Sequence, residues 1–326
     1  MLPPPHAHCN RRWPAGRYTY YMPGLLPGRD ERLSPEVLGG RRVFCCHSAT
    51  LSHEHPPNSL AAVVECVQSR VPRLEVDVRF LADDAMLIFH DAHLDAGTNG
   101  AGPVSAIDRA AAARLRFRDF PSAPLCFLED VVDAMQGAST ILQVDLKAMR
   151  PLSSARLAAL ARALEPVRDR VLIGSQAHWN LRGLHEAGYA VALDPTLQWH
   201  YRPGRNGDGL VPARLGVHGL WDDAPLADIP RVPALDYLAA RTDDLLALLP
   251  AVEWMVDYET LLYMARLGFP LGERLAERGV ELAAWTLRDE GAGRSQPLLQ
   301  ALFDLGATTI ITDDATALAA HAVGLA

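Results

Sequence analysis

The sequence has few cysteines, and they are not arranged for a disulfide framework or a zinc site. There are five, an odd number without paired spacing, whereas small disulfide-stapled domains carry an even set at regular intervals. No Cys-x-x-Cys pair occurs, so the common structural zinc motif is missing. Cys45 and Cys46 fall inside an apolar stretch, which indicates buried thiols.

Long apolar runs and an excess of positive charge are also missing. No stretch reaches the roughly 20 apolar residues that cross a bilayer, and the proline-rich start has no apolar region of the signal-peptide type. With 31 basic and 39 acidic residues, the formal net charge is −8, which disfavours non-specific binding to nucleic acid or an anionic membrane. We therefore expect a cytoplasmic protein with no stable membrane anchor and no nucleic-acid partner, of undetermined oligomeric state.

The remaining composition is that of an ordinary globular protein. The 326 residues are 49% hydrophobic and 21% charged, which suits one barrel domain or two smaller domains. Residues 1–40 are rich in proline, glycine, arginine and tyrosine without a period, and they predict an irregular N-terminal extension. Residues 195–240 also show no readable pattern. We expect one domain over residues 41–326.

From residue 42 onward, apolar strand patterns alternate with helical ones, which is typical of βαβ units and a parallel sheet. About eight such strands occur, the number that closes a TIM (β/α)₈ barrel. A turn at 82–85 predicts that a short strand at 86–90 pairs with the second strand as a hairpin addition. An open doubly wound sheet is the alternative, but no Gly-x-Gly-x-x-Gly follows the first strand. The eight strands are expected at 43–47, 73–79, 140–147, 171–175, 189–194, 252–257, 280–286 and 308–313.

The strand Arg73-Leu-Glu-Val-Asp-Val-Arg79 carries charge on one face only. Its apolar residues point one way, while Glu75, Asp77 and Arg79 point the other. Burying charges without a partner costs several kcal/mol per ion. Glu75 and Asp77 lie two residues apart and can reach one hard cation such as Mg²⁺ or Ca²⁺. The alternative is an exposed strand face.

Further polar residues collect at the predicted strand ends, where a barrel places its active site. Asp145 would supply a third carboxylate, and Lys147, facing the same way, could offset an anionic oxygen of a substrate; the alternative is a simple ion pair between them. His47 and His90 each end a strand and could act as acid and base on opposite sides of a phosphorus atom. Trp285 is expected to be part core and part pocket wall.

Two other candidates are weaker. His53-Glu54-His55 has no forced common direction on a loop, so we interpret it as a solvated segment and not as a second metal motif. Ser175 has no clear base beside it, so it is not expected to be a nucleophile.

Taken in order, these residues resemble the glycerophosphodiester phosphodiesterases. Members of that family typically show His-Arg-Gly at the first strand end, Pro-Glu-Asn-Thr at a helix start, then Glu-Leu-Asp-Val, His-Asp, Thr-Asn-Gly, Glu-x-Lys, Trp-Thr and Thr-Asp. No single element is specific, but the ordered set is. The corresponding segments here are Phe44-Cys-Cys-His47, Glu75-Val-Asp77-Val78, His90-Asp91, Thr98-Asn99-Gly100, Asp145-Leu-Lys147, Trp285-Thr286 and Thr312-Asp313.

The resemblance implies a TIM barrel with Mg²⁺ or Ca²⁺ on the three carboxylates, the two histidines as an acid/base pair, and Lys147 as a phosphate contact. In the usual mechanism of the family, a hydroxyl of the substrate's own glycerol attacks phosphorus, the alcohol leaves, and water opens the cyclic phosphate. The protein is thus expected to be a metal-dependent hydrolase of a glycerophosphodiester-like substrate, releasing an alcohol and a phosphomonoester.

The sequence departs from the family pattern at three points. His-Arg-Gly has become His47-Ser48-Ala49, Pro-Glu-Asn-Thr has become Pro56-Pro57-Asn58-Ser59, and the third acid is the shorter Asp145. Loss of the arginine removes a phosphate contact worth a few kcal/mol of transition-state binding. Arg79 and Glu54 are the candidate replacements for the lost arginine and glutamate.

Two alternatives to this hydrolase remain, the second of which follows from these departures. The first is a phospholipase-D-like barrel that cyclises a lysophospholipid head group, for which an exposed apolar rim around the site is expected. The second is a catalytically impaired barrel that binds a phosphorylated ligand, against which an intact arrangement of His47, the acids and His90 would count.

Overall fold

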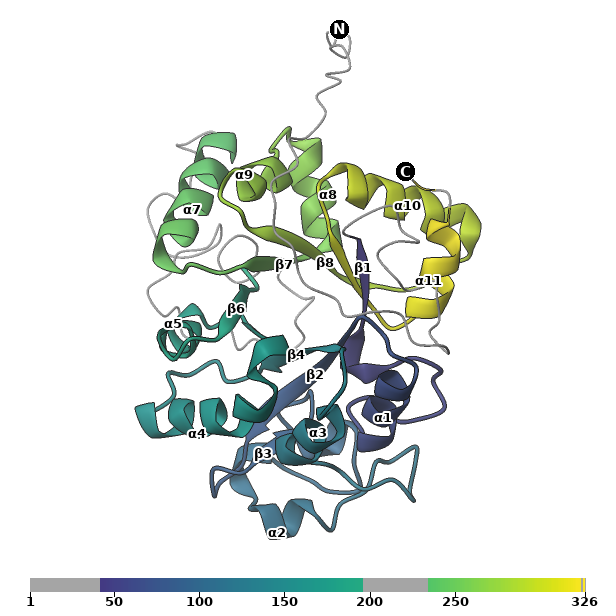
Figure 1. The fold of residues 1–326 in the computed structure, drawn as a ribbon, viewed down its shortest axis with the longest axis vertical. Helices are drawn as coiled ribbons and strands as arrows, with labels where there is room; N and C mark the ends of the chain where they lie inside the picture. The colour runs from purple at the N-terminus through teal and green to yellow at the C-terminus, as the bar shows by residue number, and fades with distance from the viewer. Residues whose placement is uncertain (1–41, 196–233, 324, 326) are drawn as a thin grey trace, which may run out of the picture.

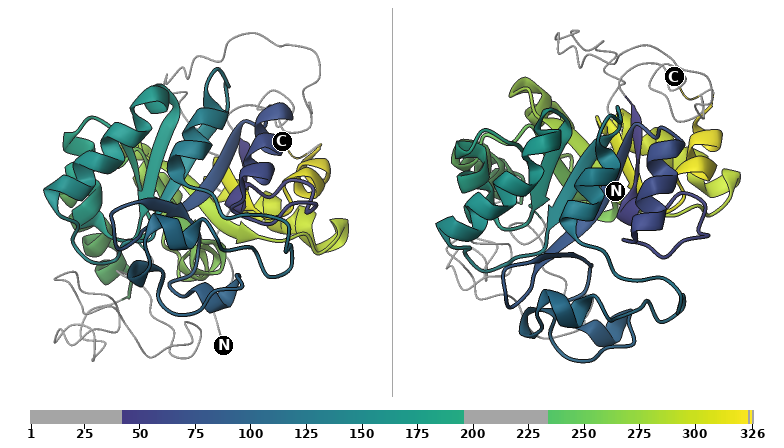
Figure 2. Two further views of the ribbon diagram at one scale, coloured as in Figure 1. Left: turned by 90° about the horizontal axis from the view of Figure 1, so that it is seen from below. Right: turned by 60° about the horizontal axis from the view of Figure 1, so that its bottom comes forward.

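Eight parallel strands close into a barrel within residues 42–195, 234–323 and 325, the part of the chain that this computed structural model describes (Figures 1 and 2). The ring is closed because the first strand pairs with both the second and the last, so the predicted TIM barrel is confirmed. The barrel strands are β1 (Val43–Cys46), β2 (Arg73–Phe80), β4 (Ile141–Leu146), β5 (Val171–Ser175), β6 (Ala190–Leu193), β7 (Glu253–Asp257), β8 (Glu281–Leu287) and β9 (Thr309–Thr312).

The predicted N-terminal extension lies outside the described residues, as does most of the segment 195–240, and the domain boundary at residue 41 stays a prediction. Helices surround the barrel in all views (Figures 1 and 2). No helix in the described segments is long and apolar enough to cross a membrane. The helices are α1 (Leu60–Gln68), α2 (Arg109–Ala112), α3 (Leu128–Met135), α4 (Ser154–Leu164), α5 (His178–Glu186), α7 (Ala234–Leu248), α8 (Tyr258–Arg266), α9 (Leu271–Glu277), α10 (Ala292–Asp304) and α11 (Ala315–Ala322).

The two faces of β2 serve different parts of the barrel. Leu74, Val76 and Val78 are fully buried in the main core, together with apolar residues of the helices. The alternate residues form a polar column. At the N-terminal end of β2, Arg73 pairs with Glu253 of β7 across the barrel at 2.7 Å. The alternation therefore separates the apolar outer layer from a charged interior, as the period of two predicts.

The predicted hairpin is confirmed, because β3 (Met86–Ile88) pairs antiparallel with the end of β2. Together with β3, the segment after it, through about residue 127, forms a small core of its own that includes Leu87, Phe89, Phe117 and Phe127. Figure 1 shows this part, with α2, projecting below the barrel.

The sequence also predicts a helical stretch near residues 105–116, and this prediction is largely wrong. Only α2 and a 3₁₀ turn at Val104–Ala106 are helical there. Asp108 caps α2, accepting a hydrogen bond from the backbone N–H of Ala111 at 2.8 Å. Beyond α2 the chain turns so that Phe117 enters the small core and its backbone pairs with Thr98. Tertiary packing overrides the local helical preference.

Candidate active site

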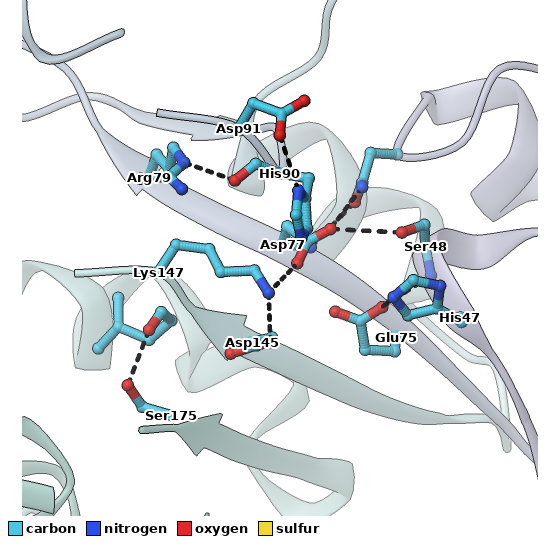
Figure 3. A network of polar contacts seen from close by, with 12 residues as sticks. His47, Ser48, Glu75, Asp77, Arg79, His90, Asp91, Asp145, Lys147 and Ser175 are labelled. Carbon is cyan, nitrogen blue, oxygen red and sulfur yellow. Dashed lines mark hydrogen bonds and ion pairs between the residues drawn. The ribbon is translucent and has the colours of Figure 1, made fainter. Parts of the chain in front are cut away.

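Three carboxylates meet at the C-terminal ends of β2 and β4. The strand register sets Asp77 beside Asp145, and Glu75 lies two residues earlier on the same face of β2. Glu75, Asp77 and Asp145 each offer an oxygen, and these oxygens lie within 4.8 Å of one another. Figure 3 shows the three side chains converging. The structure therefore brings together the predicted set of metal ligands.

The environment of Glu75 fits a hard divalent cation. Its Oε2 accepts a hydrogen bond from the backbone N–H of Ser48 at 2.7 Å, while among the described residues no donor reaches its buried Oε1. Burial and the nearby charge of Asp77 raise the pKa of Glu75 to about 8. A buried carboxylate with a free oxygen, beside two further carboxylates, is a donor set typical of Mg²⁺ or Ca²⁺.

Lys147 provides a positive charge at the same place. Its Nζ lies 2.9 Å from Oδ1 of Asp77 and 2.7 Å from Oδ2 of Asp145. Burial opposes its charge, but the carboxylates raise the pKa of Lys147 overall, so it stays protonated. The sequence contains one lysine, so 30 of the 31 basic residues are arginine. This position beside the carboxylates is compatible both with a simple ion pair between Lys147 and Asp145 and with the predicted contact to an anionic oxygen of a substrate.

His47 is oriented by a carboxylate from the neighbouring strand. Because Cys46 of β1 pairs with Thr312 of β9, the next residues of the two strands also meet, and Nδ1 of His47 lies 2.7 Å from Oδ1 of Asp313. The other ring nitrogen, Nε2, faces Glu75 at 3.9 Å. Burial opposes protonation, but the bond to Asp313 and the charge of Glu75 raise the pKa of His47 to about 9.

His90 also lies close to the acids, beside Asp77, on the segment that follows β3 (Figure 3). The strand ends at Ile88, and the backbone then turns Asp91 back towards the ring, with its Oδ1 at 3.1 Å from Nδ1 of His90. Arg79 donates from Nε to the backbone carbonyl of His90 at 2.7 Å. Its guanidinium is thus held at the rim beside His90.

Asn58 and Ser48 hold Asp77 in place, a role that the sequence did not assign. Asn58 donates from Nδ2 to Oδ2 of Asp77 at 2.6 Å and accepts from the backbone N–H of Asp77 at 2.9 Å. Ser48 donates to the same oxygen at 3.3 Å. The N-cap of the helix that follows, α1, is Ser59, whose Oγ accepts a hydrogen bond from the backbone N–H of Ala62. The match of Asn58 to the family's Pro-Glu-Asn-Thr was the signal that could have identified it.

The loop that carries these residues is strained. Ser48 and Ala49 have φ values of 49° and 55°, and Asn58 has 62°. This left-handed region costs most residues about 1–2 kcal/mol, less for asparagine. Because Ser48 replaces the family's arginine and its side chain is buried against Asp77, this position offers no phosphate contact.

A cavity of about 360 Å³ opens above the carboxylates. Asp77 is fully buried and is not among the residues that line it. Glu54 does not line this cavity and is exposed, so the structure does not bring it to the site. Sequence reasoning did not select Met149, Gln176 and Asp194, which also line it. The lining includes the predicted site residues His47, Glu75, Arg79, His90, Asp145, Lys147 and Trp285.

The remaining candidates have structural partners. His53 lies 3.1 Å from Asp314 on an exposed loop, in agreement with its interpretation as a solvated segment. Ser175 donates to the backbone carbonyl of Leu146 at 2.8 Å and is fully buried, which fits its exclusion as a nucleophile. The four cysteines of the described residues, Cys45, Cys46, Cys66 and Cys126, are buried free thiols.

Comparison with known proteins gives a consistent result. Residues 50–200 match the model of the glycerophosphoryl diester phosphodiesterase family. Among curated proteins, glycerophosphodiester phosphodiesterase 1 of Mus musculus is 28% identical over 114 residues, and that of Bos taurus is 29% identical over 104 residues. The matched regions cover 32% and 29% of this chain. The chain thus spans about a third of the length of these relatives, 34% and 31%.

Solved structures share the fold. A glycerophosphodiester phosphodiesterase of Agrobacterium tumefaciens has a TM-score of 0.56 and 20% identity, covering 86% of this chain and 99% of the other. A phosphodiesterase of Oleispira antarctica, solved with the product sn-glycerol-3-phosphate, has a TM-score of 0.59 and 15% identity, covering 85% and 95%. At these identities the likeness establishes the barrel, and the resemblance found in the sequence is confirmed by the matched family.

Proposed function

We propose that this chain, a divergent relative of the glycerophosphodiester phosphodiesterases, hydrolyses a glycerophosphodiester-like substrate to an alcohol and a phosphomonoester. The observation that carries the proposal is that His47 and His90 line one cavity together with Glu75 and Asp145, two of the three clustered carboxylates (Figure 3). The product bound in the Oleispira antarctica phosphodiesterase, sn-glycerol-3-phosphate, supports a small phosphodiester as substrate.

Glu75, Asp77 and Asp145 are the proposed ligands of Mg²⁺ or Ca²⁺. Such an ion, when bound, would neutralise the phosphate oxygens and the charge that develops on them. Lys147 and Arg79 line the same cavity and supply two further positive charges for the phosphate. Arg79 is the proposed replacement for the arginine that Ser48 displaces. Trp285 forms part of the cavity wall.

In the proposed reaction, a hydroxyl of the substrate's glycerol attacks phosphorus as the bond to the alcohol oxygen breaks. One histidine accepts the proton of the attacking hydroxyl, and the other donates a proton to the leaving oxygen. Water then opens the cyclic phosphate with the two roles exchanged. Asp313 fixes the tautomer of His47, because its carboxylate accepts from Nδ1 and leaves Nε2 facing the acids.

The two alternatives receive less support. The catalytically impaired barrel is disfavoured by the assembled arrangement of His47, the acids and His90. The phospholipase-D-like alternative predicts an exposed apolar rim around the site. Within the described residues, none of the large hydrophobic side chains that are exposed lines the cavity.

The test is a turnover assay on purified protein with a panel of glycerophosphodiesters, in EDTA, in Mg²⁺ and in Ca²⁺. We expect activity with one of the ions, no turnover in EDTA, and a fall in kcat of about 100-fold or more for His47→Ala and for His90→Ala, the usual contribution of a general acid or base. His53→Ala, which changes an exposed histidine outside the cavity, is the matched control. Turnover that stays unchanged in EDTA and in both histidine variants would overturn the proposal.

A further inference from the structure

Lys147 is the only lysine of the chain, and its ammonium bridges two of the three clustered carboxylates. Its Nζ lies 2.9 Å from Oδ1 of Asp77 and 2.7 Å from Oδ2 of Asp145 (Figure 3). The backbone of Lys147 is fixed, because its N–H donates to the carbonyl of Val78 at 3.1 Å. The side chain is a flexible four-carbon stem that lines the cavity and is 21% exposed. The ammonium can therefore move while the strand stays in place.

Both oxygens of Asp77 already have partners. Oδ2 accepts hydrogen bonds from Asn58 at 2.6 Å and from Ser48 at 3.3 Å, whereas Oδ1 contacts the ammonium of Lys147. Hard divalent ions bind carboxylate oxygens directly, and two positive charges that share one oxygen repel each other. An ion that takes an oxygen of Asp77 must therefore displace one of these partners.

The partners of Asp77 differ in how readily they can leave. Asn58 and Ser48 are 4% and 5% exposed, and a backbone hydrogen bond of 2.8 Å joins the N–H of Asn58 to the carbonyl of Ser48. Both side chains are neutral and do not repel a cation, and moving them would leave buried polar groups unpaired, which is costly. Lys147 carries the like charge and opens onto the cavity, so it is the partner that an arriving ion displaces.

A displaced ammonium needs a new anion, and the cavity wall does not supply one. Glu75 and Asp145 belong to the same carboxylate cluster as Asp77. The remaining carboxylate among the lining residues, that of Asp194, accepts a hydrogen bond from Gln176 at 3.0 Å. The phosphate of a substrate brings an anion into the same cavity, and Lys147 can then exchange a carboxylate oxygen for a phosphate oxygen.

We infer that Lys147 is an internal counter-ion of the proposed metal site, which yields Asp77 to the divalent ion and transfers to the phosphate of the substrate. This inference rests on the proposed function and adds a coupling to it. The ion and the phosphate each bind more tightly when the other is present, because each lowers the cost of moving the ammonium, and such coupling is reciprocal. A compact ammonium suits this exchange better than a guanidinium, whose rigid fork holds a carboxylate through two bonds.

The single lysine allows the exchange to be followed without any substitution. In protein made with ¹³C-labelled lysine, the NMR spectrum contains one lysine ε-methylene signal. In EDTA this signal should differ from its position in the urea-unfolded chain, because the carboxylates hold the ammonium. Saturation with Mg²⁺ or Ca²⁺ should move it towards the unfolded position. Addition of sn-glycerol-3-phosphate, a monoester that the proposed reaction does not hydrolyse, should move it away again. A signal that keeps its EDTA position at a saturating ion would overturn the inference.

Titration calorimetry with Mg²⁺ and with Ca²⁺ measures the coupling. In the unsubstituted protein, sn-glycerol-3-phosphate should tighten ion binding about tenfold, within the usual range of coupling between sites. Lys147→Met removes the charge and keeps a long side chain. Without the phosphate it should bind the ion about tenfold more tightly than the unsubstituted protein, and the phosphate should then add less than about threefold. Lys147→Gln should behave in the same way, and it replaces the methionine variant if that variant does not fold.

Arg79→Met is the matched control, because it removes one positive charge from the wall of the same cavity. Arg79 donates to the backbone carbonyl of His90 and not to a carboxylate. The ion affinity of this variant without the phosphate should therefore stay within about twofold of the unsubstituted protein, since only screened long-range repulsion is lost. An equal gain in affinity in the Arg79 and Lys147 variants would indicate a general effect of charge and would overturn the exchange.

These measurements need no turnover, so they separate the two proposals. Ion binding that leaves Lys147 in place overturns the exchange even if diesters are hydrolysed. Coupled binding with a moving lysine signal supports the exchange even if no diester is hydrolysed, a result that would overturn the proposed hydrolysis instead. A protein that binds neither ion overturns the exchange together with the proposed metal site.

Discussion

At the scale of single residues, the site depends on side chains that touch no substrate. Asp313 holds Nδ1 of His47 at 2.7 Å and also pairs with the exposed Arg288 at 3.0 Å. Asn58 binds both the side chain and the backbone of Asp77. Each of these contacts orients a group that the proposed chemistry uses, and each comes from an element distant in the sequence. The orientation of the reacting groups is therefore a property of the assembled barrel.

Asp313→Asn should change the pH profile of the enzyme as well as its rate. Without the carboxylate, His47 loses its tautomer control and the charge that raises its pKa, so kcat should fall about 10–100-fold, as for other orienting partners, with a much smaller change in KM. The limb of the pH–rate profile that reports His47 should move to lower pH. Asp314→Asn, next in sequence but paired with exposed His53, is the control. A lower kcat with an unmoved profile would leave Asp313 with a merely structural role.

At the scale of elements, β2 divides the barrel interior into levels. Arg73 forms the floor with Glu253 and Gln143, Glu75 and Asp77 form the site, and Arg79 reaches the rim. One alternating strand thus supplies a buried ion pair, two proposed metal ligands and a proposed phosphate contact. The period of two, readable in the sequence, accounts for all four positions lying on one face.

The floor ion pair can be tested apart from the site. Glu253→Gln leaves the guanidinium of Arg73, only 4% exposed, without a counter-charge. Breaking one side of a buried pair costs about 3–5 kcal/mol, so the free energy of unfolding, measured with urea, should fall by about 3 kcal/mol. The double variant Arg73→Met/Glu253→Leu should recover much of that loss. A single-variant loss below about 0.5 kcal/mol would contradict this role.

At the scale of the whole molecule, the parts that the sequence predicted are those that depend on short-range periodicity. The eight strands and the polar residues at their ends follow from local patterns, and the closed barrel then brings Glu75, Asp77 and Asp145 together. The bond between His47 and Asp313 joins residues 266 positions apart. Such contacts depend on closure of the ring, which no local pattern encodes, and they were not assigned.

Loop geometry was also beyond local patterns. The left-handed backbone at Ser48 and Asn58 turns their polar groups towards Glu75 and Asp77, and nothing in the residue types requires this conformation. In the segment after β3, the helix predicted at 105–116 forms only in part, because Phe117 packs into the small core. In both places, packing over long sequence separations decided the outcome.

The stability of the metal-free protein should fall as the pH rises. Burial and the charge of Asp77 raise the pKa of Glu75 from 4.5 to about 8, and Asp313 and Glu75, against the effect of burial, raise that of His47 from 6.5 to about 9. A raised pKa means that the folded state holds its proton longer than the unfolded state. The stabilisation is complete below the unfolded pKa and is lost as the pH rises through the folded pKa.

The free energy of unfolding, measured with urea in EDTA, should therefore fall by about 2 kcal/mol between pH 6 and pH 8. This is less than the limit of about 1.4 kcal/mol per pH unit for each titrating group, because His47 is a quarter exposed. Glu75→Gln, which cannot titrate at this position, should reduce this slope to the part that His47 contributes. A saturating divalent ion should oppose the loss, because it binds the deprotonated carboxylates, and its affinity should rise with pH as Glu75 releases its proton. A slope that Glu75→Gln leaves undiminished would contradict the role of Glu75 as one of the titrating groups.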